Sequence, residues 1–154
     1  MINKRNLLIV ITIFTNLLLS CAMTYAGEKK GDMILGLWFT EENKSKVEIY
    51  ETQNIYKGKF IWLKKEMDEG KAVLDSENPD PKEKNKPLIG KEFVWNFRFD
   101  SGANKWVDGR IYNPEDGKTY MCSLSLEKDG RLLVRGSIDA WGLLGKTQFW
   151  TRVK

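Results

Sequence analysis

The sequence of 154 residues contains no histidine. Imidazole general bases, Ser-His and Cys-His nucleophilic pairs and nearly every catalytic zinc site are therefore excluded, because each needs a group that titrates near neutrality or a neutral nitrogen ligand. Walker-type and dinucleotide-binding glycine motifs are absent as well. We accordingly expect no bound cofactor.

Cysteine is scarce, with only Cys21 and Cys122 in the chain. If Cys21 is removed with an N-terminal segment or carries a lipid, Cys122 has no partner for an intramolecular disulfide. Its neighbours Met121 and Ser123 include no base that would activate the thiol. An apolar, alternating stretch surrounds Cys122, so we expect a small buried side chain.

The excess of positive charge is small, with 25 lysines and arginines against 21 aspartates and glutamates. Without residues 1–26 the balance is 23 bases to 21 acids. Nucleic-acid binding depends largely on lysines and arginines that neutralise phosphates, so this balance argues against a nucleic-acid partner.

The first 26 residues have the three parts of a secretory signal peptide. Lys4 and Arg5 come first, an apolar run over 7–19 follows, and small residues come last. This run is shorter than the roughly 20 residues of a membrane-spanning helix. We expect residues 1–26 to direct export to the periplasm or the cell exterior, and residues 27–154 to form one domain.

Two cleavage sites compete. Cleavage after Ala26 would use the small side chains of Thr24 and Ala26 and release a soluble protein. Cleavage before Cys21 would use Leu-Leu-Ser-Cys at 18–21, which resembles a bacterial lipobox, and would leave a lipid-anchored protein on a membrane. The soluble product is preferred, and the lipoprotein remains the alternative.

Beyond Gly27 the sequence alternates apolar and polar residues, with β-branched and aromatic side chains between turn formers. Within 88–99 the alternation places Phe93, Trp95, Phe97 and Phe99 on one face. The pattern predicts about eight strands, at 34–40, 46–51, 55–63, 88–99, 105–112, 118–126, 132–138 and 146–153. Short turns between them indicate an all-β antiparallel meander, closed into a barrel without exposed edges; a β-sandwich is the alternative.

Residues 64–87 interrupt this rhythm with a long polar segment. Connections of this length in a compact domain are typically lids, binding loops or disorder. Prolines stiffen the segment, and Val73 with Leu74 could attach its middle to the barrel. We expect an ordered flap over one mouth of the barrel.

Oxygen ligands are dense in this flap, at Asp75, Glu77, Asn78 and Asp80. Such a cluster could hold a hard cation, but it lacks EF-hand spacing. The preferred interpretation has Asp75 and Asn78 capping turns through side-chain to backbone hydrogen bonds, with no bound metal.

Gly36 and Trp38 near the start, and Trp150 and Arg152 near the end, predict how a barrel would close. The first and last strands of a closed meander are neighbours, so the Arg152 guanidinium could stack on the Trp38 indole, while Gly36 lets the strand bend. Alternatively, Trp38 is a core residue and Arg152 a surface cation. The arrangement resembles the Gly-x-Trp and late Arg of lipocalins and related calycin barrels.

A longer series of motifs resembles the bacterial secreted domain of unknown function 2147 family. The matching strings are GKFIWL at 58–63, Asp75 with NPDP at 78–81, PLIG at 87–90, WVDGRIYNP at 106–114, DGKTY at 116–120, LLVRG at 132–136 and TQFWTR at 147–152. Members often carry a second glycine before the Ile-Tyr pair, where this chain has Asp108-Gly109-Arg110. The resemblance implies an exported all-β domain and no established activity.

Three arginines, Arg98, Arg110 and Arg135, lie on predicted strands. An arginine pointing into the barrel would need a carboxylate, either from the ligand or from candidates such as Glu92, Asp108 and Asp139. The preferred alternative is that each points outward and covers apolar surface with its methylene groups.

Three aromatic residues, Trp106, Tyr112 and Trp141, complete the candidate ligand site. Trp106 and Trp141 flank glycine-rich connections and could line a barrel mouth, although most tryptophans of a small barrel belong to its core. Tyr112 and Tyr120 flank a turn symmetrically, which favours a cross-strand pair.

We therefore expect a monomeric exported barrel, without enzymatic activity, that binds a small amphiphilic or anionic ligand. One alternative is a structural or interaction protein of the cell envelope. The other is a glycan hydrolase that uses carboxylates such as Asp75 and Asp108, for which no pair with suitable spacing is evident.

Overall fold

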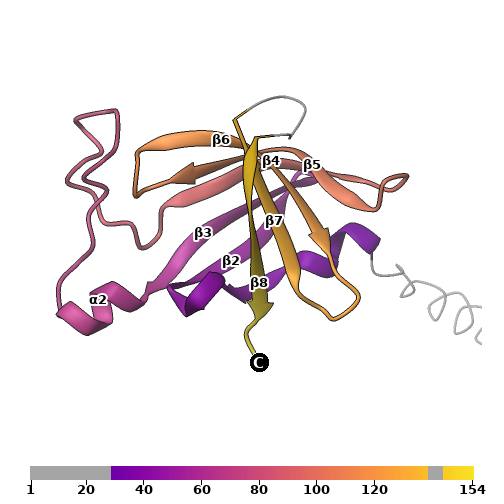
Figure 1. The fold of residues 1–154 in the computed structure, drawn as a ribbon, viewed down its shortest axis with the longest axis horizontal. Coiled ribbons are helices and arrows are strands. Elements are labelled where there is room, and N and C mark those ends of the chain that lie inside the picture. Colours follow the sequence, from indigo (N-terminus) through magenta and orange to yellow (C-terminus); the bar gives the residue numbers. More distant parts are fainter. Residues whose placement is uncertain (1–28, 139–143) are drawn as a thin grey trace, which may run out of the picture.

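The computed structural model describes residues 29–138 and 144–154. The expected signal peptide, Asp139 and Trp141 lie outside the described residues. Eight antiparallel strands form a closed barrel in chain order (Figure 1). They are β1 (Gly36–Phe39), β2 (Ser45–Thr52), β3 (Ile55–Leu63), β4 (Glu92–Asp100), β5 (Lys105–Asn113), β6 (Lys118–Leu126), β7 (Leu132–Ser137) and β8 (Gly145–Arg152).

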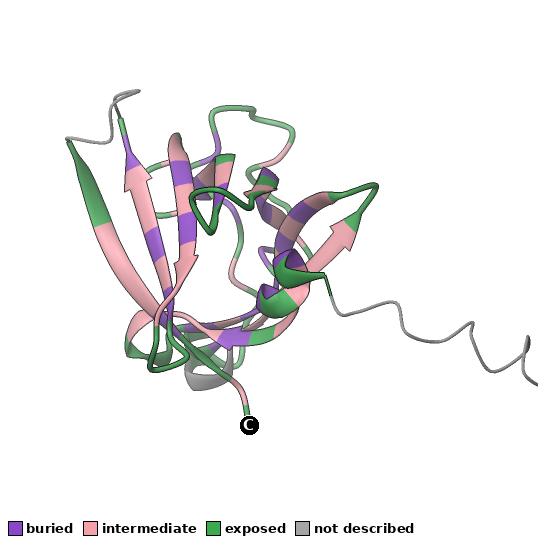
Figure 2. Ribbon diagram, turned by 90° about the vertical axis from the view of Figure 1, so that its right-hand side faces the viewer, coloured by how far each residue is buried: buried purple, intermediate pink, exposed green. Residues whose placement is uncertain are grey.

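In the described residues, three short helices accompany the strands: η1 (Lys30–Ile34), η2 (Glu41–Asn43) and α2 (Lys64–Glu69). None of the helices in the described part of the chain has the length and apolar character needed to cross a membrane. Seen from the side, the strands form a ring along which buried and less buried segments alternate (Figure 2). The predicted meander barrel is confirmed, and the β-sandwich alternative is wrong.

The barrel closes where the sequence predicts. Trp38 of β1 lies opposite Arg152 of β8, and the Arg152 guanidinium lies 4.3 Å from the centroid of the Trp38 ring. Arg152 also donates a hydrogen bond of 2.8 Å to the backbone oxygen of Leu35. Gly36 has a φ of +113°, a backbone conformation that side chains disfavour. Its conformational freedom therefore lets β1 begin beside Arg152.

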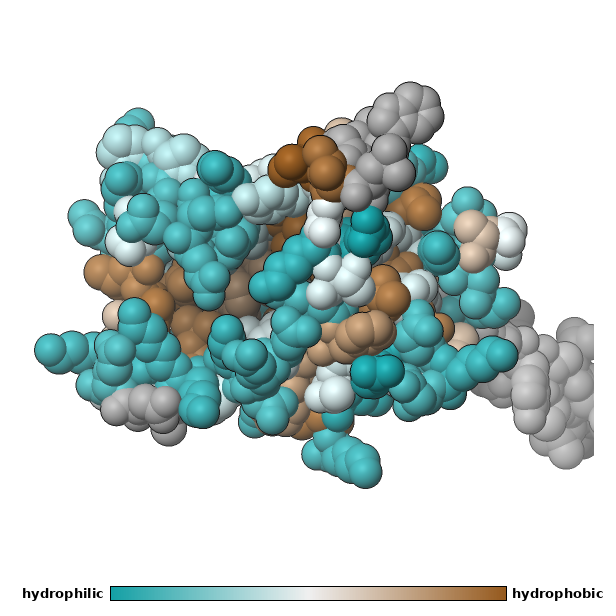
Figure 3. All heavy atoms as spheres, viewed as in Figure 1, coloured by the Kyte–Doolittle hydropathy of each residue, from teal (hydrophilic) through white to brown (hydrophobic). Residues whose placement is uncertain are grey.

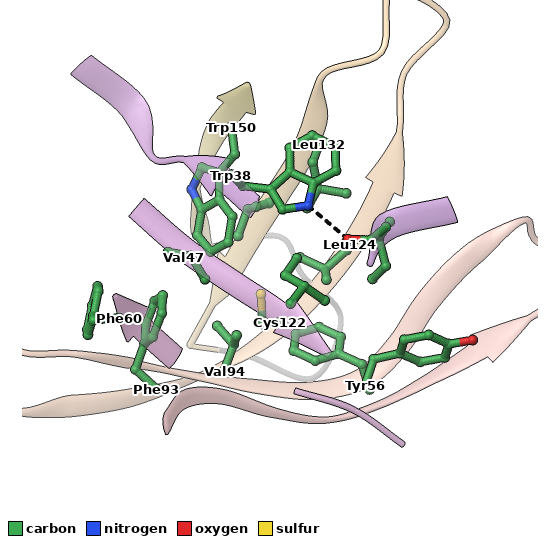
Figure 4. Packing of buried hydrophobic residues seen from close by; sticks show 14 of the residues in the cluster. Trp38, Val47, Tyr56, Phe60, Phe93, Val94, Cys122, Leu124, Leu132 and Trp150 are labelled. Carbon is green, nitrogen blue, oxygen red and sulfur yellow. Dashed lines mark hydrogen bonds between the residues drawn. The ribbon is translucent and has the colours of Figure 1, made fainter. Parts of the chain in front are cut away.

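The 3₁₀ helix η1 seals one end of the barrel. Ile34 and Trp38 have no exposed surface, and the Trp38 indole N–H donates to the Ile34 carbonyl at 2.8 Å (Figure 4, dashed line). The Trp106 indole N–H donates to the carbonyl of Gly31 at 3.0 Å, and the Tyr56 hydroxyl to Asp32 at 2.8 Å. The buried polar groups of Trp38, Trp106 and Tyr56 thus each have a hydrogen-bond partner here, and we call this end of the barrel the closed end.

Irregularities in β4 and β5 break the alternation of the sequence pattern. Val94 and Phe97 are both buried although three residues apart, and Asn96 between them has a φ of +63°. The expectation that Phe93, Trp95, Phe97 and Phe99 share one face is therefore wrong. The register between β3 and β4 shifts on both sides of Gly58 of β3, which lies opposite Val94. Such shifts are typical of a β-bulge.

Residues 70–91, which we call the strap, connect α2 to β4 along the outside of the open end of the barrel (Figure 1). Leu74 forms an isolated bridge with Pro87. Gly90 N–H donates to the carbonyl of Phe60 at 2.7 Å, and Phe60 N–H to the carbonyl of Lys91 at 3.1 Å. The strap therefore continues the hydrogen bonding of β3 rather than forming a detached loop.

Candidate functional site

The end of the barrel opposite η1 contains a cavity of about 1280 Å³. Its inner part is lined by apolar side chains of the barrel, namely Phe60, Phe93, Ile111, Val134 and Trp150. The strap contributes Val73, Leu74 and Leu88 to one wall. Figure 3 shows the entrance as an apolar recess between the strap and α2.

An aromatic floor separates this cavity from the closed end. The rings of Phe60 and Phe93 are stacked, with centroids 3.7 Å apart and an interplanar angle of 11°. Trp150 lies 6.0 Å from Phe93 between centroids and is 1% exposed (Figure 4). Trp150, expected to help close the barrel, does lie on the closing strand, and its side chain also lines the cavity. Large aromatic surfaces favour contact with apolar or planar molecules.

The rim of the cavity is charged. Four lysines and five acids line it: Lys44, Lys65, Lys118, Lys146, Glu41, Glu69, Glu77, Glu115 and Asp116. An apolar interior below a polar rim suits a molecule with one apolar and one polar end, because each part then meets a matching surface.

The strap is fastened to the barrel through Asp75, which has no exposed surface. Its carboxylate accepts hydrogen bonds from the Tyr112 hydroxyl at 2.6 Å and from the Asn78 amide at 2.6 Å. The Lys91 ammonium lies 2.9 Å away and 5.1 Å from the centroid of the Tyr112 ring. These contacts tie the strap to β5, so it forms a fixed wall of the cavity.

The charges around Asp75 are mutually supportive. Burial has the largest influence on its pKa and would raise it, but the hydrogen bonds from Tyr112, Asn78 and Lys91 together outweigh burial and lower the pKa from its ordinary value of 3.8. Burial, and then the hydrogen bond to Asp75, raise the pKa of Tyr112. At neutral pH Asp75 is therefore an ionised acceptor and Tyr112 a neutral donor.

The flap residues behave partly as expected. The side-chain oxygen of Asn78 accepts from the Asp80 N–H at 2.9 Å, and Asp80 accepts from the Lys82 N–H at 3.0 Å. Asp75 differs from the prediction, because the hydrogen bonds of its carboxylate go to side chains rather than to a turn. Within 29–138 and 144–154, no three His, Cys, Asp or Glu residues are grouped to hold a metal ion.

The predicted arginine residues lie outside the cavity. Arg98 is exposed and pairs with Asp108 on the outer surface. Arg135 donates to the Thr147 hydroxyl at 3.1 Å, while its neighbours Val134 and Gly136 line the cavity. Alternation along β7 therefore directs Arg135 outward.

In the described residues, Arg110 and Glu92 also do not form a charge pair inside the barrel. Arg110 donates to the carbonyl of its neighbour Gly109 and does not line the cavity. Glu92 accepts from the Tyr50 hydroxyl at 2.7 Å and from Lys57 at 3.2 Å. The three candidate arginines are thus not brought together, and none of them lines the cavity.

The aromatic candidates divide between the two ends. Trp106 is 2% exposed and packs at the closed end, so it does not line a mouth. Tyr112 does line the cavity, in addition to holding Asp75. Tyr120 lies opposite Ile111, and Tyr112 opposite Thr119, so the expected cross-strand tyrosine pair is wrong.

Two cavity residues, Lys146 and Gln148, were not among the ligand-binding residues predicted from the sequence. Both line the cavity, as does Trp150 on the same strand. Counting back from Trp150 in steps of two would have placed both on the inner face.

Cys122 is buried and forms no disulfide in the described part of the chain. Burial raises the pKa of its thiol to about 12. We expect Cys122 to resist Ellman's reagent at pH 8 in the folded protein and to react completely in denaturant, because the thiolate is the nucleophile. The measurement uses a Cys21→Ser variant, and rapid reaction of the folded protein would contradict the burial.

Comparison with solved structures places the fold. Protein HP1028 from the human pathogen Helicobacter pylori, described as belonging to the lipocalin family, is 31% identical to this chain, with a TM-score of 0.69. The likeness covers 79% of this chain and 83% of that one. Among curated proteins none matches.

The family model described as an uncharacterized protein conserved in bacteria (DUF2147) matches residues 36–152. These residues run from the start of β1 to the end of β8 and include the closure pair, Trp38 and Arg152. The chain therefore belongs to the DUF2147 family, and its fold is a lipocalin-like barrel.

Proposed function

We propose that this protein binds a small amphiphilic molecule in the cavity at the open end of its barrel. One observation carries the proposal: an apolar cavity of about 1280 Å³ with an aromatic floor and a charged rim. This volume exceeds the roughly 300–1,000 Å³ of a typical site for a drug-sized ligand. The description of HP1028 as a lipocalin-family protein supports the same reading.

The test compares two variants that add the same ring on opposite faces of the barrel. Gly136 lines the cavity, and a Cβ at this position would have no neighbour closer than 3.6 Å, so Gly136→Phe fills the cavity without a backbone clash. Thr151→Phe adds a phenyl ring at an exposed position of β8. Binding is followed by the fluorescence of Nile red, a neutral apolar dye.

We expect Nile red to bind the unaltered protein and the Thr151→Phe variant equally. The Gly136→Phe variant should bind at least about tenfold more weakly, because its ring occupies the apolar space that the dye would fill. Absence of dye binding by the unaltered protein, or equal binding by all three proteins, would overturn the proposal.

We also propose that the protein is exported and acts in the periplasm, outside the cell or, if Cys21 is lipidated, on a membrane. The pattern of residues 1–26 supports this proposal. The mass of the protein purified from its host separates the alternatives: cleavage after Ala26, cleavage and acylation at Cys21, or retention of residues 1–26, which contradicts export.

We propose binding without catalysis. Asp75 is committed to three donors, and its lowered pKa leaves no proton to donate at neutral pH. Asp108 pairs with Arg98 on the outer surface. Neither carboxylate therefore supports glycan hydrolysis, and release of sugars from cell-wall material by the purified protein would contradict this proposal.

A further inference from the structure

Strand β8 directs three different side chains into the cavity. Lys146 lies opposite Gly136, Gln148 opposite Val134, and Trp150 opposite the buried Leu132. Lys146, Gln148 and Trp150 all line the cavity. The strand thus offers a cation at the rim, an amide below it and an indole at the floor.

The residues between them confirm this direction. The Thr147 hydroxyl accepts from Arg135, and the Arg131 guanidinium lies 4.3 Å from the centroid of the Phe149 ring. Because successive side chains of a strand point to opposite faces, these outer contacts fix Lys146, Gln148 and Trp150 on the inner face.

Lys146 and Gln148 have donors to spare. Within residues 29–138 and 144–154, the Lys146 ammonium forms no ion pair. The Gln148 side-chain oxygen accepts from the Trp150 indole N–H at 3.4 Å. The Gln148 amide N–H groups have no acceptor among the same residues. At about 3.3 Å per residue, the two side chains leave the strand about 7 Å apart.

The neighbouring charges of the rim are already engaged in part. Asp116 accepts from the Tyr120 hydroxyl and from the Lys118 N–H. Lys44 pairs with Glu42 at 3.0 Å. Lys146 is a rim cation on the same strand as Trp150 of the aromatic floor.

We infer that Lys146 and Gln148 form a head-group subsite for a carboxylate, with the apolar body of the ligand lying along Trp150 toward Phe93. The inference rests on the proposed function and names its ligand class. One ammonium and one amide match a singly charged head with two acceptor oxygens. Lys146 and Trp150 are four positions apart on β8, so the body extends about 13 Å from head to floor.

The experiment measures displacement of Nile red from the full-length protein by decanoate and by decanol, which share a chain length and differ in charge. We expect decanoate to displace the dye at about tenfold lower concentration, since a hydrogen bond to a charged group adds about that factor. Lys146→Met should remove this advantage and leave decanol unchanged. Gln148→Leu should reduce it.

Lys105→Met is the matched control, because Lys105 is exposed at the start of β5, beside the closed end. This variant should retain the preference for decanoate, and Lys146→Glu should reverse it through repulsion. Equal displacement by the two probes, or equal losses for both in Lys146→Met, would overturn the subsite while the cavity proposal stands. Failure of Nile red itself to bind is the separate outcome that removes the proposed function.

Discussion

Trp38→Ala is expected to lower the free energy of unfolding by about 3–5 kcal/mol, the usual cost of removing a large buried aromatic side chain. Trp38 has no exposed surface. Its ring carries the Arg152 guanidinium at 4.3 Å, and its N–H satisfies the carbonyl of Ile34. The substitution removes the packing, the cation contact and the hydrogen bond together, where β1 and β8 close the barrel.

Denaturant unfolding followed by circular dichroism measures the effect, with Trp62→Ala as the control. Trp62 is partly exposed and contacts Phe39 edge-on, with ring centroids 6.3 Å apart. Its removal should cost less than half as much. Equal losses of stability in the two variants would contradict the prediction, because the buried contacts of Trp38 would then contribute no more than those of the partly exposed Trp62.

Asp75→Ala is expected to cost about 3 kcal/mol, within the range measured when one partner of a buried charged pair is removed. The substitution leaves the Tyr112 hydroxyl, the Asn78 amide and the Lys91 ammonium without their acceptor. Glu48→Ala is the control, since Glu48 pairs with Lys59 on the surface at 41% exposure. Surface pairs contribute no more than about 1 kcal/mol.

The same carboxylate predicts how the effect depends on pH. Because the folded pKa of Asp75 is lowered, its contribution is fully present above its ordinary value of 3.8 and is lost as the pH falls through the lower, folded value. The stability difference between the unaltered protein and Asp75→Asn should therefore be constant from pH 7 to pH 5 and narrow below pH 3.8. A difference that grows on acidification would contradict the structure.

The strand pattern and the closure pair could be predicted from the sequence because they depend on local alternation and on chain order. Strands β3 and β6 have the predicted bounds. The first predicted strand is too long, since Ile34 belongs to η1. Trp38 and Arg152 could be paired because the first and last strands of a closed meander are neighbours.

The direction of side chains could not be predicted once the alternation slipped. In β5, Trp106 and Gly109 are both buried, and Asp108 between them has a φ of +61°. Strict alternation from Trp106 would have placed Arg110 and Tyr112 on the same face as the indole. Asn and Asp adopt a positive φ more readily than most other residues, but their presence in a sequence does not by itself predict this conformation.

The partner of Asp75 was equally inaccessible from sequence. Tyr112 lies 37 residues further along the chain. Only the folded path of the strap brings the two together. Local reasoning assigned Asp75 to a turn because turns are the short-range use of an aspartate side chain.

The seal formed by η1, Trp38 and Trp106 has a consequence for how a ligand would enter and leave the barrel. In the described part of the chain, this seal closes the other end of the barrel, so a molecule bound in the cavity would have to leave through the entrance by which it came in. Entry and release of a ligand of the proposed kind would therefore use the same route. Transfer of a bound ligand would then depend on an acceptor with higher affinity at that entrance, since the closed end offers no second route.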